Sequence, residues 1–254
     1  MNTEHSRSPL TDPIRTLESG IITPEHVLNR TTLSTHIDTA VIFFRPTLSD
    51  AVLAKCEPLY DFVAAASILT QYVYDNRIVI ARSPLGGPAA GGLIEELRAL
   101  GVKRFIACGS SGMVGEMDPS HFLIVTRAIR DEGLSHHYLS PSLYVDTDAA
   151  LSATIGKALR KRTFKYEEGI VWTTDAFFRE TPSRVERRKT QGAIAVDMEC
   201  ASMAAVCKYH ERPFAQVLYF SDILEQKAWS GFREERRSLH ALISEAMVAI
   251  ALEL

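Results

Sequence analysis

Short runs of β-branched and apolar residues alternate along this chain with longer stretches in which apolar residues recur every three or four positions. The longer stretches predict helices at Pro88–Leu100, Glu199–His210 and Glu234–Leu254. Alternation of the two patterns is typical of a layered α/β domain. The short runs predict strands at Thr39–Phe44, Arg77–Arg82, Lys103–Cys108, Phe122–Thr126, Ile170–Thr173, Ala193–Val196 and Phe214–Phe220.

The length and composition favour a single globular domain. The chain has 254 residues, of which 46% are hydrophobic and 23% charged, enough to bury a sizeable core. No internal repeat or Pro/Ser-rich linker divides it, so we expect one domain over residues 16–254, after a flexible polar tail at residues 1–15. Thr23, Pro24 and Glu25 supply the N-cap, first-turn proline and first-turn acid of an early helix.

Charge and composition exclude several classes of function. A net charge of -3 and a pI near 6.3 leave no excess of basic residues to neutralise a nucleic acid. No apolar run approaches the roughly 18 residues of a membrane span, so no membrane partner is expected. The 4 cysteines lie far apart without a CxxC pair, which predicts reduced core thiols and a cytoplasmic protein. His136 and His137 are adjacent and would point apart on a strand, so no metal site is expected.

Acidic residues and glycines gather where predicted strands end. Asp197 and Glu199 stand where one strand gives way to a helix, and Asp222 follows another strand. The glycine-rich segments Gly86-Gly87-Pro88 and Gly109-Ser110-Ser111-Gly112 follow two more, at the sheet edge where α/β proteins bind ligands. Each segment alone is equally typical of a tight connecting turn, because neither matches a known phosphate-binding fingerprint. Together they indicate a site for a polyhydroxylated, nitrogen-bearing substrate.

The order of four segments resembles the nucleoside phosphorylase superfamily, in the branch of purine nucleoside and uridine phosphorylases and their nucleosidase relatives. The resemblance spans roughly residues 80–250. It implies a three-layer α/β/α fold with a central mixed β-sheet, and a homo-oligomer built from dimers, up to a hexamer. The segments are Gly86-Gly87-Pro88 with Glu95-Glu96-Leu97 and Gly101; Gly109-Ser110-Ser111-Gly112; Thr174-Asp175-Ala176-Phe177-Phe178; and Asp197-Met198-Glu199 through Ser221-Asp222.

The resemblance also implies how a nucleoside would be held. Glu199 matches the carboxylate that accepts hydrogen bonds from the ribose hydroxyls, with Asp197 and Met198 beside it. Ser221-Asp222 matches the pair by which purine-specific members hydrogen-bond or protonate the base at N7, and uridine-specific members have no such pair. A helix-terminal acid and a turn-capping acid are the alternative structural roles of Glu199 and Asp222.

Two further residues complete the implied base site. Phe177 matches the aromatic that stacks on the base, although Phe178 could equally be the one in contact, and both could be core residues. Arg236 falls one residue later than the arginine that purine-type members pair with the base-binding acid. It lies in a charged run from Arg233 to Arg237, where a solvated side chain is an equally good interpretation.

The implied phosphate site departs from the family pattern. Ser110, with the backbone of Gly109 and Gly112, matches the phosphate-binding segment, but Ala107 occupies the position of an arginine found in phosphorolytic members. Phosphate binding usually needs guanidinium or ammonium charge as well as backbone donors. Arg45 and Arg82 are the nearest substitutes in the sequence.

The sequence therefore predicts a purine nucleoside phosphorylase that transfers ribose to inorganic phosphate as co-substrate, with no bound cofactor. Two alternatives stay open. One is a hydrolytic nucleosidase that uses water, although the glutamate that activates water in such relatives has no match in Arg45-Pro46-Thr47. The other is a catalytically weakened member that binds a nucleoside or base as a sensor.

Overall fold

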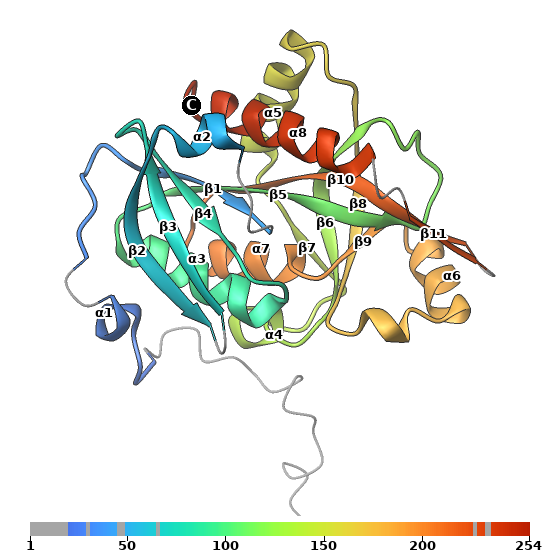
Figure 1. Cartoon of the computed structure of the whole chain (residues 1–254). Coiled ribbons are helices and arrows are strands. Elements are labelled where there is room, and N and C mark those ends of the chain that lie inside the picture. Colours follow the sequence, from blue (N-terminus) through green and yellow to red (C-terminus); the bar gives the residue numbers. More distant parts are fainter. Residues whose placement is uncertain (1–19, 29–30, 45–48, 65–66, 226–227, 232–234) are drawn as a thin grey trace, which may run out of the picture.

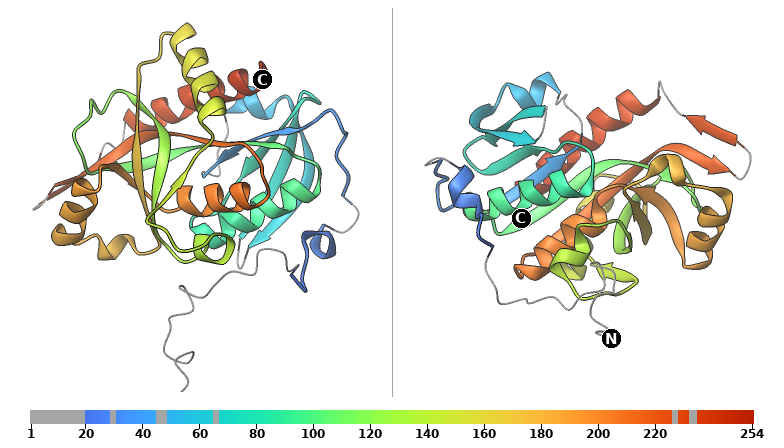
Figure 2. Two further views of the ribbon diagram at one scale, coloured as in Figure 1. Left: turned by 180° about the vertical axis from the view of Figure 1, so that it is seen from behind. Right: turned by 90° about the horizontal axis from the view of Figure 1, so that it is seen from below.

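The computed structural model describes residues 20–28, 31–44, 49–64, 67–225, 228–231 and 235–254, with the side chains of residues 67, 225, 228–231 and 235–240 excepted. A mixed β-sheet runs through its centre, with helices on both faces (Figures 1 and 2). The α/β fold class predicted from the sequence is confirmed. The proposed division into a tail at residues 1–15 and one domain stays a prediction, because that tail lies outside the described residues.

The sheet contains every strand that the sequence predicted and several more. Its order is β11-β10-β6-β8-β9-β5-β1-β4-β3-β2, with β7 paired to β6. The strands are β1 (Thr39–Phe43), β2 (Cys56–Ala64), β3 (Ser67–Tyr74), β4 (Ile78–Arg82), β5 (Arg104–Met113), β6 (Phe122–Asp131), β7 (Tyr144–Asp146), β8 (Tyr166–Thr174), β9 (Ala193–Asp197), β10 (Phe214–Glu225) and β11 (Ala228–Gly231).

Part of the sheet closes on itself. Strand β10 pairs with β5 as well as β6, and β9 pairs with both β5 and β8, so that β5, β10, β6, β8 and β9 form a ring. Such closure brings strand ends that are distant in sequence to one rim. The rim where β5, β9 and β10 run together holds the candidate site described below.

Two buried clusters pack the faces of the sheet. Residues of α3 and α7 join one cluster, and residues of α5 and α8 join the other. Figure 1 shows α3, α4 and α7 on one side of the sheet and α2, α5 and α8 on the other. The helices are α1 (Pro24–Val27), α2 (Asp50–Leu53), α3 (Gly87–Ala99), α4 (Ser135–Tyr138), α5 (Ala149–Lys161), the 3₁₀ turn η3 (Phe177–Arg179), α6 (Pro182–Thr190), α7 (Cys200–Tyr209) and α8 (Glu235–Ala251).

Three strands, β5, β6 and β10, continue well beyond their predicted ends, and the extensions of β5 and β10 lie at the site. Gly109-Ser110-Ser111-Gly112 was predicted as a turn after a strand, but β5 continues through it to Met113, paired with β10. Asp222 was expected at a strand end, but β10 continues to Glu225. Small and polar residues in a sequence usually indicate a turn. Here a neighbouring strand forms hydrogen bonds with their backbone groups, so the strand continues.

The free cysteines agree with the prediction of core thiols. Cys108, Cys200 and Cys207 are buried and Cys56 is half-buried, and all are unpaired. Among the helices described, none combines the length and apolar character needed to cross a bilayer.

Candidate active site

A cavity of about 590 Å³ opens at the rim formed by β5, β9 and β10. Its walls come from segments that are far apart in sequence. Most of the residues predicted to bind a nucleoside lie on it. The lining residues are Leu85, Ser110, Ser111, Gly112, Phe177, Phe178, Glu180, Val196, Asp197, Met198, Glu199, Ser221, Asp222 and Leu224.

Glu199 occupies the N-cap position of α7 and is 5% exposed. Its Oε1 accepts a hydrogen bond of 2.7 Å from the backbone N–H of Gly86, the N-cap of α3. Gly86 has φ of 99°, a left-handed conformation that glycine adopts without strain and that aims this N–H at Glu199. Burial, and then the charge of Asp197, raise the pKa of the Glu199 carboxyl above its ordinary range.

Asp197 is bound on both carboxylate oxygens by groups of the protein. Oδ1 accepts from Thr173 Oγ1 at 2.7 Å, and Oδ2 accepts from the Cys200 N–H at 2.9 Å and Gln216 Nε2 at 3.1 Å. The side chain thus ties β9 to β8, to β10 and to the start of α7. Asp197 lines the cavity, and its role on the substrate stays a prediction. Its contacts also fit a residue that positions Glu199.

Ser221 and Asp222 lie at an irregularity of β10. The register with β5 shifts between Phe220 and Asp222, so that Ser221 is the extra residue of a bulge. Ser221 Oγ donates to Asp222 Oδ1 at 2.5 Å and lies 3.2 Å from the carbonyl oxygen of Ser111. Bulges re-aim side chains, and this one places both residues on the wall of the cavity.

An aromatic pair forms the outer wall. Phe177 and Phe178 belong to η3, and their ring centroids lie 4.0 Å apart at 40°. Phe177 is 51% exposed and Phe178 88%, so neither is a core residue. The alternative in which both aromatics are buried in the core is therefore wrong.

Glu180, directly after η3, also lies on this wall and was not predicted from the sequence. Burial, followed by the charge of Asp222, raises the pKa of its carboxyl to about 7, against an opposing effect of Arg184. No sequence motif singled it out, because its importance depends on contacts across the fold.

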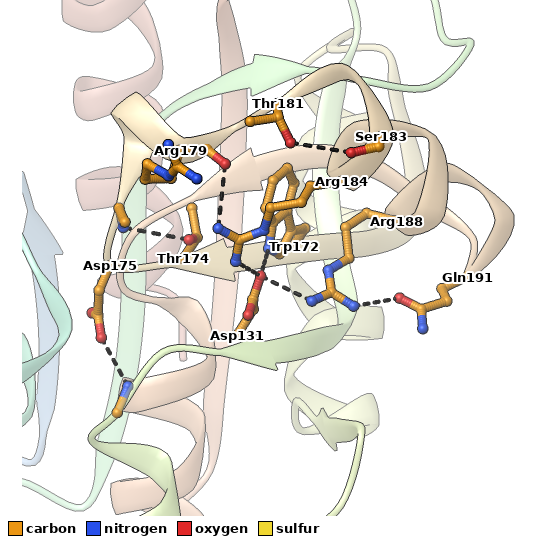
Figure 3. Close-up of polar contacts among 12 residues, drawn as sticks. Asp131, Trp172, Thr174, Asp175, Arg179, Thr181, Ser183, Arg184, Arg188 and Gln191 are labelled. Carbon is orange, nitrogen blue, oxygen red and sulfur yellow. Dashed lines mark hydrogen bonds and ion pairs between the residues drawn. The ribbon is translucent and has the colours of Figure 1, made fainter.

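The wall carrying η3 is attached to the sheet through Asp131 at the end of β6 (Figure 3). Oδ2 of Asp131 accepts from Trp172 Nε1 at 2.9 Å and pairs with Arg184 at 2.6 Å and Arg188 at 2.9 Å. Both arginines come from α6. Arg184 also donates to the carbonyl oxygen of Arg179 at 3.2 Å, which links η3 to the same cluster.

The predicted phosphate residues are only partly brought together. Ser110 and Gly112 line the cavity, whereas Gly109 does not, and a side chain at 109 would collide with Phe44. Ala107 is fully buried. Arg82 ends β4 and is half-buried, with an Nε that has no hydrogen-bond partner. Arg45 lies outside the described residues, as does the side chain of Arg236 in α8.

Within the described part of the chain, no group of three or more His, Cys, Asp or Glu side chains has an arrangement that could hold a metal ion. His136 and His137 belong to α4, not to a strand as expected.

The sequence profile of the phosphorylase superfamily matches residues 53–253, most of the chain and all of the cavity. The chain belongs to this superfamily. The family that the order of motifs suggested is therefore confirmed.

Curated relatives within the superfamily are phosphorylases of different substrates. A guanosine phosphorylase of Halorubrum lacusprofundi is 28% identical over 138 residues, 53% of this chain and 57% of that protein. A uridine phosphorylase of Haemophilus influenzae is 26% identical over 42% of this chain and 43% of its own length. The chain thus spans about half the length of the curated relatives it matches.

Solved structures of the superfamily share the fold. The Helicobacter pylori 5′-methylthioadenosine/S-adenosyl homocysteine nucleosidase superposes with a TM-score of 0.70, 20% identity and coverage of 87% of this chain and 100% of that one. A uridine phosphorylase from Vibrio fischeri superposes with a TM-score of 0.67 and 21% identity, covering 87% of this chain and 90% of that one. Phosphorolytic and hydrolytic proteins are therefore both among its structural neighbours.

Proposed function

We propose that the cavity cleaves the N-glycosidic bond of a purine nucleoside and transfers the ribose to inorganic phosphate. The observation that carries this proposal is the convergence of Glu199, Phe177 and the Ser221-Asp222 pair on one cavity of about 590 Å³. A cavity of this size suits a nucleoside, and its walls present an acid for a sugar, a ring for a base and an acid for a leaving group.

Glu199 would bind the ribose. Glycosidic cleavage places positive charge on the sugar ring, and a carboxylate that accepts from the 2′- and 3′-hydroxyls holds the ring and stabilises that charge. Its Oε1 already accepts from Gly86, which leaves Oε2 for the sugar. Met198 lines the cavity beside it and would pack against the ribose, while Asp197 would fix the position of Glu199.

Asp222 would assist departure of the base. When a phosphate oxygen bonds to C1′, the C1′–N9 bond breaks and its electron pair moves into the purine. A proton delivered to N7 neutralises that charge, and a carboxyl group at this point of the cavity can supply it. Phe177 would stack on the flat face of the base. The Ser221-Asp222 pair supports purines over pyrimidines.

Phosphate is the proposed acceptor because relatives named for guanosine, uridine and purine nucleosides are all phosphorylases. Ser110 lines the cavity. Arg82 is not among the lining residues, and it offers a positive charge at the end of β4. Arg82, Phe43 and Cys108 are in register across β4, β1 and β5. Since side chains alternate along a strand, Ser110 projects from the same sheet face as Cys108 and Arg82. We assign Arg82 and Arg45 as the cations of the site.

Hydrolysis is the second candidate, and the fully buried Ala107 favours it. A methyl group there provides no charge for phosphate, and nucleosidases are among the structural neighbours. A binding protein without turnover is the remaining alternative.

We also infer a cytoplasmic homo-oligomer. Val63 and Ile68, on the hairpin of β2 and β3, are 61% and 66% exposed, and Phe178 at the cavity mouth is 88% exposed. Exposed apolar side chains of this size are typical of surfaces covered by another subunit. Sedimentation velocity of the purified protein tests the inference, since a monomer at micromolar concentration would contradict it.

The proposed reaction is tested by incubating the protein with inosine, with and without phosphate, and quantifying hypoxanthine, ribose 1-phosphate and free ribose. Phosphate-dependent ribose 1-phosphate supports phosphorolysis. Phosphate-independent free ribose would establish hydrolysis instead.

A further inference from the structure

Glu180 is a carboxyl group on the cavity wall to which the family resemblance assigns no role. It lies on the same cavity as Asp222 and Phe177, the residues proposed to hold the base. Its backbone N–H donates to the carbonyl oxygen of Phe177 at 3.3 Å, which closes the η3 turn and fixes Glu180 next to the aromatic pair. Within the described part of the chain, its half-buried carboxylate has no hydrogen-bond partner.

The segment that carries Glu180 is held rigidly. Arg184 binds the carbonyl oxygen of the preceding residue, Arg179, and pairs at 2.6 Å with Asp131 of the sheet (Figure 3). Because the Arg184 guanidinium pairs with Asp131, it attracts the Glu180 carboxylate only at a distance. Glu180 therefore has no direct partner. A desolvated acid without a partner costs stability, and proteins keep such groups mainly where a ligand satisfies them.

Glu180 and Asp222 both line this cavity, so both carboxyl groups can face the edges of a bound base. Asp222 is proposed above to donate at N7, and an ionised Glu180 can only accept hydrogen bonds. The base end of the cavity thus offers a donor and a separate acceptor. A purine with an acceptor at N7 and an N–H on its six-membered ring matches that pair.

We propose that Glu180 is a specificity-determining residue that accepts hydrogen bonds from N–H groups on the six-membered ring of the base, and so selects 6-oxopurines. The inference rests on the proposed function of the cavity. It assigns recognition of the base to two acids, Asp222 at N7 and Glu180 at the N–H of the six-membered ring, with Phe177 against the face of the ring.

Binding of free bases to the intact protein tests this assignment without requiring turnover. Hypoxanthine carries an N1–H donor that unsubstituted purine lacks. Isothermal titration calorimetry would compare binding of both bases to the wild type, to Glu180→Ala, which removes the acceptor, and to Glu186→Ala. Glu186 is an exposed acid of α6 and provides the matched control.

We expect Glu180→Ala to weaken binding of hypoxanthine about tenfold or more and binding of unsubstituted purine less than about twofold, because a site that loses a matched hydrogen bond discriminates by at least this factor. Glu186→Ala should change neither affinity. An unchanged ratio of the two affinities in Glu180→Ala, with the wild type binding both bases, would overturn the role of Glu180 alone. Failure of the wild type to bind either base would overturn the proposed function and this inference with it.

Discussion

The backbone N–H of Gly86 donates a hydrogen bond of 2.7 Å to Oε1 of Glu199, which joins the N-cap of α3 to the N-cap of α7. Glu199 is thereby fixed at a cavity wall by a group that no side-chain substitution can remove. The positive end of the α7 dipole also favours its charge, while burial and Asp197 oppose it.

Glu199→Gln should lower turnover at least about 100-fold, because an amide binds the ribose hydroxyls without the charge that stabilises the transition state. The substitution should also make the free energy of unfolding less dependent on pH. Since the pKa of Glu199 is raised above its ordinary value of 4.5, the folded protein holds this proton more tightly than the unfolded chain. The free energy of unfolding therefore falls as pH rises from 4.5 towards the raised value, and Gln removes that loss.

Thermal unfolding of wild type and Glu199→Gln between pH 5 and pH 9, beside an inosine assay, checks both effects. The variant is expected to lose less stability than the wild type across this range. Parallel pH profiles with a full loss of activity would mean that the folded wild type ionises this carboxyl at its ordinary pKa, which would contradict the raised pKa.

Asp222→Asn should depress purine turnover by about 10²–10⁴-fold, the usual contribution of a general acid. Asparagine can still accept from Ser221 but cannot deliver a proton to N7. Asp118→Asn is a suitable control, because Asp118 is an exposed acid paired only with its neighbours Ser120 and His121. Steady-state kinetics with inosine measures both variants, and normal activity of Asp222→Asn would remove this acid from the mechanism.

Gly87→Ala should disturb the contact between α3 and α7. A Cβ at 87 would lie 2.2 Å from Ser202 Oγ, so α3 or Ser202 must shift, and Gly86 would shift with it. We expect a loss of about 1–3 kcal/mol of unfolding free energy and a higher KM.

Gly92→Ala, on the same helix, is the matched control for that substitution. Its nearest neighbour would be Phe62 Cζ at 3.9 Å, ordinary contact distance. Alanine there should leave the free energy of unfolding unchanged or raise it by about 0.4–1 kcal/mol, because it reduces the conformational entropy of the unfolded chain. Urea denaturation compares the two variants, and equal stabilities would show that α3 adjusts freely to the added methyl group.

Asp131→Asn should loosen the wall that carries Phe177. The change weakens the contacts with Arg184, Arg188 and Trp172, and losing such partly buried charged hydrogen bonds costs about 1–3 kcal/mol. Asp146→Asn removes an exposed pair with Arg127 and should cost less than about 1 kcal/mol. Urea denaturation provides the comparison. Equal losses would indicate that the Asp131 cluster contributes no more than a surface ion pair.

The sequence predicted those elements whose signals are local. Helix α3 was expected at Pro88–Leu100 and runs over Gly87–Ala99, because glycine, proline and periodic leucines mark it. Helix α6 was missed, since Val185 is its only buried residue and its other positions are polar. The hairpin of β2 and β3 was missed as well, because Phe62 is the one buried residue of β2 and the strand contains Pro58.

The residues of the site also divide into those with a local sequence signal and those without one. Motif order pointed to Glu199 and Asp222, and both lie on the cavity. Glu180 and Asp131 have no motif, since their surroundings arise only when α6 folds against β6 and β8. The bulge at Ser221 and the continuation of β5 through Ser110 depend on strand pairing, which a single sequence does not reveal.

The most direct test is the release of hypoxanthine from inosine by the purified protein, followed at saturating substrate with inorganic phosphate either absent or at millimolar concentration, and with both sugar products quantified. We predict that release requires phosphate and yields ribose 1-phosphate in equal amount. Release at the same rate without phosphate, with free ribose as the sugar product, would contradict transfer to phosphate. Absence of release under either condition would contradict glycosidic cleavage itself.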